Sequence, residues 1–244
     1  KNYDMRAILT SEQVEKVAST KALLHTTFDN ETTFTHIYYL AQVYIATKID
    51  KYKEASEKGI QFILDAQFAN GGWPQYFPLE KNYSRHITFN DGAYMGIMNL
   101  LDKIVNTNPN FAFIDEGLKS KVTIAYNKGL DCILNMQIKD KGRLTAWCQQ
   151  HDEETLAPAW ARKFEPPSIC NGESVDVVLF LMKMKNPNER IVQSIQSAVK
   201  WFADSRIYNT KVESFEIEAF DSKYKTVKRD VRVVVDSTAA PIWT

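Results

Sequence analysis

The stretch Gly59-Ile-Gln-Phe-Ile-Leu-Asp-Ala-Gln-Phe68 decides the fold, because the chain repeats it at an almost constant interval. It returns seventy residues later as Gly129-Leu-Asp-Cys-Ile-Leu-Asn-Met-Gln-Ile138, and a fainter copy, Ala198-Val-Lys-Trp-Phe-Ala-Asp-Ser-Arg-Ile207, follows after sixty-nine more. A fixed period is typical of repeat architectures, in which each unit buries its apolar face against its neighbours. The repeat therefore separates a scaffold from the long connections after each copy, which hold most of the residues able to do chemistry.

Each copy is expected to form the second helix of a helical hairpin. Apolar residues recur at three- and four-residue intervals through 52–66, and the preceding segment 33–47 has the same pattern. The equivalent helices are expected near 91–105, 116–137, 173–185 and 188–205. Asn186-Pro187 separates the last two, because the residue before proline avoids helical dihedrals. A further helix is expected to start near Thr10, whose spacing to Gln13 fits a capping box.

Three helical hairpins predict an all-α ring, an (α/α)3 toroid with a few short strands at one end; a linear helical solenoid is the alternative. The long loops run about 70–89, 138–171 and 207–244, and loops beyond ~15 residues in a compact domain are usually functional. Each follows the second helix of a hairpin, so all three should lie at one end of the ring. In the third loop, 231–235 is read as a strand that pairs with 215–220. No linker is visible, so residues 1–244 are predicted to form a single domain.

The composition argues against several classes of protein. The 244 residues include thirty basic and thirty acidic side chains, without the basic surplus expected of a nucleic-acid binder. No apolar run approaches the roughly 18 residues that a membrane span needs. Cys132, Cys148 and Cys170 form no CxxC pair and are interpreted as small buried residues rather than a disulfide framework or zinc site. Motifs for zinc proteases, P-loops, dinucleotide folds and nucleophile elbows are absent.

The first long loop contains Asn70-Gly-Gly-Trp-Pro-Gln-Tyr-Phe-Pro78. Its glycines permit positive φ and a tight turn that brings the backbone close to a neighbour. Trp73 and Tyr76 have apolar ring faces and a polar edge, which suits stacking on a sugar ring. A turn pinned by a buried tryptophan is the alternative.

Asn90 and Asp91 end the same loop, where a helix is expected to begin. Either residue is a natural N-cap, and the helix dipole favours a carboxylate there. A carboxylate in a cleft can equally bind a hard cation such as calcium through its oxygens. The residue types alone leave both interpretations open.

The second long loop is the densest polar stretch of the chain. It holds Thr145-Ala-Trp-Cys-Gln-Gln-His-Asp152, then Pro158-Ala-Trp-Ala-Arg162 and Glu165. Aromatic rings beside an arginine suit an anionic carbohydrate, because the rings take the sugar face while arginine pairs with a carboxylate. A self-contained ion pair of Arg162 with Glu165 is the alternative. Asp91 and Asp152 could also serve as the paired carboxylates of a glycoside hydrolase.

A series of motifs runs through nearly the whole chain. In order they are Thr27-Phe-Asp-Asn30 with Thr32-Thr33, Asn70-Gly-Gly-Trp-Pro-Gln75, Ile87-Thr-Phe-Asn-Asp91, Thr145-Ala-Trp-Cys-Gln-Gln-His-Asp152, Ala159-Trp-Ala-Arg162 with Glu165-Pro-Pro167, Glu173-Ser174 and Ala239-Ala-Pro-Ile-Trp243. Together they resemble the pectate lyases of polysaccharide lyase family 10.

The resemblance implies a secreted, periplasmic or cell-surface monomer that cleaves polygalacturonate by β-elimination with calcium. It implies no nucleic-acid or membrane partner. Carried over by motif, Asp91 resembles the family's calcium-binding aspartate and Asp152 another acid of the same cleft. The residues that match positions along the substrate groove are Trp73, Gln75, Asn90, Trp147, Gln149 and Glu165. Asp91 and Arg162 are the catalytic candidates.

The chemistry requires a base, because the C5 proton of galacturonate is too weakly acidic to leave unaided even with calcium on the neighbouring carboxylate. The resemblance implies an arginine in this role, within a later Trp-x-Arg-Phe motif. The printed chain stops at Trp243-Thr244, so we expect a lyase domain truncated at its C-terminus, with Arg162 as the second candidate for the base. A non-catalytic binder of acidic polysaccharide is the alternative function.

Overall fold

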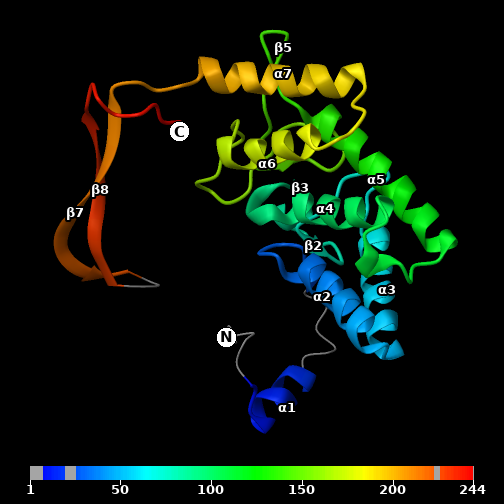
Figure 1. The fold of residues 1–244 in the computed structure, drawn as a ribbon. Helices are drawn as coiled ribbons and strands as arrows, with labels where there is room; N and C mark the ends of the chain where they lie inside the picture. The colour runs from blue at the N-terminus through cyan, green and yellow to red at the C-terminus, as the bar shows by residue number, and fades with distance from the viewer. Residues whose placement is uncertain (1–7, 20–25, 223–225, 244) are drawn as a thin grey trace. The chain divides into compact units, whose positions relative to one another are not determined.

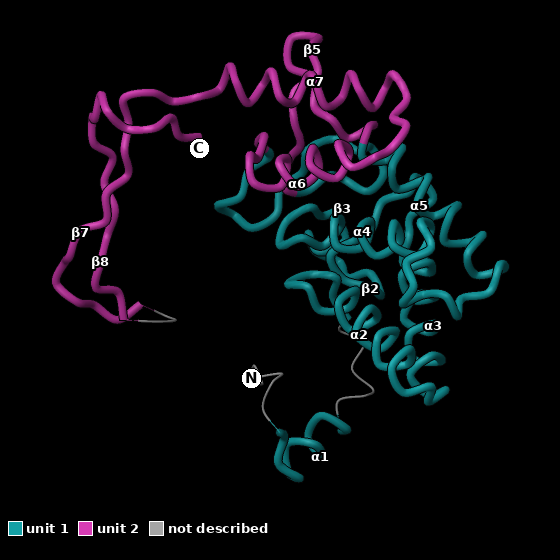
Figure 2. The backbone as a smooth tube through the Cα atoms, in the orientation of Figure 1, with its two compact units in different colours: residues 1–133, 150–167 teal, residues 134–149, 168–244 magenta. Residues whose placement is uncertain are grey.

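The computed structural model describes residues 8–19, 26–222 and 226–243. Helices dominate these ranges and the strands are few, as the repeat predicts (Figure 1). The chain divides into two compact units, residues 1–133 with 150–167 and residues 134–149 with 168–244 (Figure 2). No helix in the described ranges combines the length and apolar character that crossing a membrane would require.

Within the described residues, the first unit contains four helices and most of a fifth. They are α1 (Ser11–Ser19), α2 (Thr32–Thr47), α3 (Asp50–Asp65), α4 (Ala93–Val105) and α5 (Glu116–Met136). The periodicity placed α2 to α5 within two residues at either end, and the capping-box spacing placed the start of α1 within one. The capping box of α1 is confirmed: the Thr10 N–H donates to Gln13 Oε1 at 2.8 Å, and the Gln13 N–H donates to Thr10 Oγ1 at 3.3 Å.

Short strands and 3₁₀ turns fasten the loops of the first unit. The antiparallel pairs are β1 (Thr26–Thr27) with β2 (Tyr76–Phe77) and β3 (Ile87–Thr88) with β6 (Gln150–His151). The 3₁₀ turns are η1 (Tyr83–Arg85), η2 (Asn90–Gly92) and η3 (Pro109–Phe111). The pairs bring the segment before α2 to the loop after α3, and that loop to the segment after residue 149.

The glycine that opens each of the first two repeat copies marks a close contact between helices. A Cβ at Gly59 on α3 would lie 2.5 Å from Ile37 Cγ1 on α2. A Cβ at Gly129 on α5 would lie 2.6 Å from Met98 Sδ on α4 and 2.8 Å from the Trp73 ring. The third copy has Ala198 at this position, fully buried on α7. A small residue therefore recurs because a larger one would push the packed helices apart.

The second unit holds α6 (Asn171–Met182), α7 (Glu189–Asp204), the small pair β4 (Lys139–Asp140) with β5 (Arg143–Leu144), and the hairpin of β7 (Thr210–Asp221) and β8 (Thr226–Val235). The strand at 231–235 was predicted, but its predicted partner was wrong: 231–235 pairs with 210–214, and 215–220 pairs with residues before 231. The hairpin pairs from Thr210 opposite Val235 to Asp221 opposite Thr226, with a register shift between Glu216 and Phe220. Charged residues extend it, and Arg232 Nη2 lies 3.4 Å from Glu213 Oε2 on the opposite strand.

None of the three cysteines forms a disulfide, and the prediction that they are buried is confirmed for two of them. Cys132 and Cys148 are buried, and Cys170 is partly exposed.

We predict that Gly129→Ala destabilises the protein by about 1–3 kcal/mol, the usual range for overpacking, even though alanine is the better helix former by about 1 kcal/mol. Gly172→Ala is the matched control, because a Cβ at this helical position meets nothing within 4 Å. It should leave stability unchanged or raise it slightly. Urea unfolding measures both variants, and equal effects of the two substitutions would contradict the packing role of Gly129.

Candidate active site

Asp29 is a buried carboxylate with one unsatisfied oxygen. Its side chain lies directly after β1 and is 8% exposed. Oδ2 accepts a hydrogen bond from Gln75 Nε2 at 2.9 Å. Neither Asp29 Oδ1 nor Gln75 Oε1 has a hydrogen-bond partner within the described residues. Since buried polar atoms are nearly always paired, two orphaned oxygens at one place indicate a site for a ligand.

A second carboxylate, Asp91, lies beside Asp29. The pKa of Asp29 is raised above its ordinary value, first by burial and then by the negative charge and hydrogen-bonding proximity of Asp91. Asp91 is exposed on η2, and its Oδ2 accepts from Asn90 Nδ2 at 3.0 Å. In the part of the chain that the structure describes, the side chains that donate to this pair are therefore neutral amides. Two carboxylates held together with no cationic side chain hydrogen-bonded to either form a site that favours a cation.

The backbone beside both carboxylates adopts a conformation that side chains other than glycine disfavour. Asn30 and Glu31, after Asp29, have φ of 51° and 58°. Asp91 itself has φ 52°, and Gly92 has φ 72°. Holding a residue other than glycine at positive φ costs free energy, and such strained residues cluster at functional sites. The N-cap of α4 is Gly92 without a side-chain capping bond, so the interpretation of Asn90 or Asp91 as a helix cap is wrong and the Asp91 carboxylate is free to serve a ligand.

Arg162 and Glu165 form the ion pair that the sequence offered as an alternative to ligand binding. Arg162 Nε donates to Glu165 Oε2 at 2.7 Å, and Arg162 Nη2 also contacts Glu165 Oε1, so the pair is bidentate. The hydrogen bonds that Arg162 donates to Glu165 raise the pKa of Arg162, with a smaller contribution from the charge of Asp91. The Arg162 guanidinium therefore lies within electrostatic reach of Asp91. The predicted ion pair is confirmed, and ligand binding by the two residues stays a prediction.

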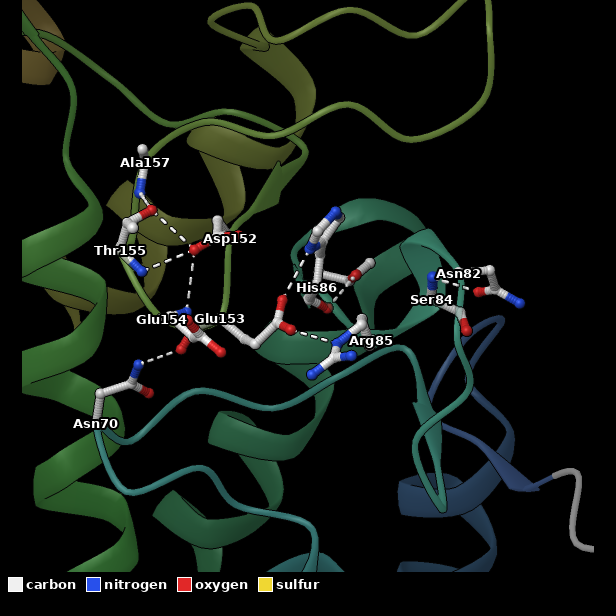
Figure 3. Close-up of polar contacts among 11 residues, drawn as sticks. Asn70, Asn82, Ser84, Arg85, His86, Asp152, Glu153, Glu154, Thr155 and Ala157 are labelled. Atoms are coloured by element: carbon white, nitrogen blue, oxygen red, sulfur yellow. Dashed lines mark hydrogen bonds and ion pairs between the residues drawn. The ribbon is translucent and has the colours of Figure 1, made fainter.

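Asp152 belongs to a different cluster, shown in Figure 3. Its Oδ1 accepts from the Thr155 N–H at 2.7 Å, Thr155 Oγ1 at 2.8 Å and the Glu154 N–H at 3.1 Å. These bonds, from Thr155 first, lower the pKa of Asp152. The carboxylate thus closes the turn at 152–155.

Glu153 joins this turn to the first long loop (Figure 3). Its carboxylate pairs with Arg85 and lies 2.9 Å from His86 Nδ1, while Asn70 Nδ2 donates to its backbone carbonyl at 2.7 Å. Ligand atoms of His86, Asp152 and Glu153 lie within 4.8 Å of one another. Because Arg85 already balances Glu153, this cluster fits a divalent cation less well than Asp29 with Asp91. The expectation that Asp152 holds a metal stays a prediction, with His86 and Glu153 as its neighbours.

Trp73 and Trp147, expected along the substrate groove, are core residues instead. They are 1% and 0% exposed, so neither presents a ring face to a sugar. Trp73 Nε1 donates to the Ile63 carbonyl at 2.9 Å, and its ring packs edge-on against Tyr94 at 5.3 Å. The alternative, a turn pinned by a buried tryptophan, is therefore the correct one.

The turn before Trp73 is pinned to a helix rather than to a ligand. Gly71 has φ 96°, and a Cβ there would collide with the Lys128 carbonyl of α5. Tyr94 Oη donates to the carbonyls of Gly71 at 3.1 Å and Gly129 at 2.9 Å. Loop and scaffold are therefore locked together next to Gln75.

The remaining predicted residues divide between the two units. Gln75, Asn90, Asp91, Arg162 and Glu165 lie in the first unit. Gln149 lies in the second, where its Nε2 donates to Cys170 Sγ at 3.7 Å. Asp29 was not predicted as a site residue. The segment Thr27–Asn30 contributed to the family resemblance, but nothing in its spacing assigned the aspartate a role.

Comparisons with known proteins agree on one family. A family model described as pectic acid lyase matches residues 1–244. A solved structure of a family 10 polysaccharide lyase from Cellvibrio cellulosa is 30% identical, with a TM-score of 0.75 over 88% of this chain and 64% of that chain. An aspartate-to-alanine mutant of a family 10 lyase from the same organism, in complex with trigalacturonic acid, matches equally, over 65% of its length. The chain thus spans slightly less than two thirds of these relatives. None of the curated proteins matches it.

Proposed function

The chain belongs to the pectic acid lyase family, and we propose that it cleaves α-1,4-polygalacturonate by β-elimination, with calcium held at the Asp29–Asp91 pair, to give unsaturated oligogalacturonides. The observation that carries the proposal is the carboxylate pair itself. Asp29 is buried and Asp91 is exposed, the side chains that donate to them are neutral amides, and Arg162 lies within electrostatic reach of Asp91.

The residues present fit calcium. Calcium takes carboxylate and amide oxygens as ligands, and the site offers the unpaired Asp29 Oδ1, the unpaired Gln75 Oε1 and the Asp91 carboxylate. The ligand atoms named here are all oxygens, whereas a typical zinc site uses thiolate sulfur and imidazole nitrogen. Asp29 and Asp91 would hold the ion, while Gln75 Nε2 keeps the Asp29 carboxylate oriented.

The reaction needs a way to make the C5 proton of galacturonate labile. Bound calcium supplies a Lewis acid for the neighbouring carboxylate and so lowers the cost of the negative charge that develops when the proton leaves. The proton itself must go to a group of the protein. The C4–O4 bond to the next sugar then breaks as the C4=C5 double bond forms, and the departing O4 takes a proton from water. Each cleavage therefore leaves a 4,5-unsaturated end.

We assign Arg162 as the proton acceptor. A guanidinium must lose a proton before it can accept one, and Glu165 opposes this by raising the pKa of Arg162. The assignment therefore requires the pair to open when substrate binds, so that Glu165 no longer holds the cation. The surroundings permit this, because Arg162 is exposed and its pairing with Glu165 is local to one short turn.

The finer statements of architecture and location belong to the same proposal. The three hairpins form a single (α/α)3 domain, which is supported by the recurrence of a small residue at the same place in each repeat copy and by the match over residues 1–244. We propose that the protein acts as a monomer. We also propose that it is secreted, periplasmic or at the cell surface, because its substrate lies outside the cell.

We predict that the protein releases products that absorb in the near ultraviolet from polygalacturonate in calcium, and that chelation abolishes the reaction. Asp91→Ala should lose activity even at saturating calcium, since it removes half of the carboxylate pair. Ultraviolet absorbance measures the unsaturated product in calcium, with chelator and with the Asp91→Ala variant. Binding of polygalacturonate without any unsaturated product would support the non-catalytic binder instead, and saturated products would indicate a hydrolase.

A kinetic comparison separates a base from a binding cation at Arg162. Arg162→Lys keeps the positive charge, so a binding role predicts a raised KM with kcat nearly unchanged. The role of base predicts instead a loss of about 10²–10⁴ in kcat. Glu165→Gln should shift the rise of kcat with pH toward lower pH, because it removes the group that raises the pKa of Arg162. A kcat of Arg162→Lys within a few-fold of the original would contradict the assignment.

A further inference from the structure

We propose that Trp160 and Phe164, on either side of Arg162, form an aromatic subsite on which the ring of a neighbouring galacturonate residue stacks when a polygalacturonate chain is bound. The proposal rests on the proposed function, since it takes the same polysaccharide as ligand. It deepens that function by making the site one for a chain of sugars rather than for a single uronate.

The exposure of these two rings is the first observation. Trp160 is 56% exposed and Phe164 is 73% exposed. The other tryptophan of the first unit, Trp73, is buried in the core. A single exposed apolar residue is normal on a protein surface. Two large exposed aromatic residues on either side of an arginine of a candidate site are less ordinary, and a cluster of exposed apolar side chains can mark a binding site.

The backbone that carries the rings is held at both ends. The Ala159 N–H donates to the Gln150 carbonyl at 3.0 Å, which ties the segment to β6. The Ala161 N–H donates to the Glu165 carbonyl at 3.2 Å, and the Glu165 N–H donates to the Arg162 carbonyl at 2.8 Å, which closes a tight turn. A turn held this way presents its side chains with little ordering cost on binding.

The position of Arg162 shows which ring faces a sugar can reach. The Arg162 guanidinium carbon lies over the Phe164 ring, 4.9 Å from its centre, so it covers one face of that ring and the sugar would take the other. A galacturonate ring has an apolar face of C–H groups, which suits an aromatic side chain. Because Arg162 is assigned to the reacting sugar, the two rings are left to hold the neighbouring one.

The test measures binding of hexagalacturonate to Trp160→Ala and Phe164→Ala by isothermal titration calorimetry, in saturating calcium and on an Arg162→Lys background that slows turnover. Each variant should bind about fivefold to tenfold more weakly, in line with the energy of an aromatic contact. Trp160→Phe should restore most of the affinity. Tyr39→Ala is the matched control, because Tyr39 is an aromatic residue 64% exposed on α2, and its loss should change nothing.

The outcomes separate this proposal from the function on which it rests. If the unaltered protein neither binds nor cleaves hexagalacturonate, the proposed function fails and the subsite fails with it. If the unaltered protein binds and cleaves it, and both aromatic variants bind as tightly as Tyr39→Ala, the subsite alone is overturned. Since both rings are exposed, thermal unfolding of the variants should match that of the unaltered protein, which makes weaker binding attributable to the lost rings.

Discussion

Repulsion between the carboxylates of Asp29 and Asp91 is the constraint on which the rest of the site depends. Burial and the neighbouring charge both raise the pKa of Asp29, so its surroundings in the folded chain disfavour the ionised form. A fold keeps such an arrangement only when the surrounding structure determines it. Here the residues next to each carboxylate have left-handed backbone dihedrals, and an amide fixes each side chain.

The helical scaffold supplies the rigidity that holds the pair. Gly59 and Gly129 let successive helices approach closely, and Gly71 lets the first long loop rest on the backbone of α5. The Tyr94 hydroxyl then bonds to that loop and to α5 together. Gln75 follows a few residues later in the same loop and reaches Asp29. A closely packed core transmits a shift of one helix to its neighbours. The packing of the repeated helices therefore also sets the positions of Gln75 and Asp29.

The sequence predicted the regular elements well because periodicity is a local property. The helices end within a few residues of where their apolar spacing stops, and the capping box of Thr10 and Gln13 formed as expected. The strand at 231–235 was predicted but its partner was not, because charged residues lengthen the hairpin of β7 and β8 beyond its apolar runs.

The site was predicted less completely. Spacing could not show whether Trp73 and Trp147 point inward or outward, and both are buried. Asp29 escaped notice because its importance comes from Asp91, which only the tertiary fold brings beside it. The Arg162–Glu165 ion pair followed directly from residue types three positions apart.

The most direct test of the account is the melting temperature of the unaltered protein and of Asp29→Asn, each with chelator and with excess calcium. Asparagine keeps the shape and can still accept from Gln75, so without calcium the variant should melt higher; a gain of 1 kcal/mol corresponds to about 2–4 °C in a chain of this size. Calcium should then stabilise only the unaltered protein. Asp152→Asn is the control of opposite sign, because the lowered pKa of Asp152 means that its charge stabilises the fold. An Asp29→Asn variant that melts lower in chelator and gains as much from calcium as the unaltered protein would contradict the account.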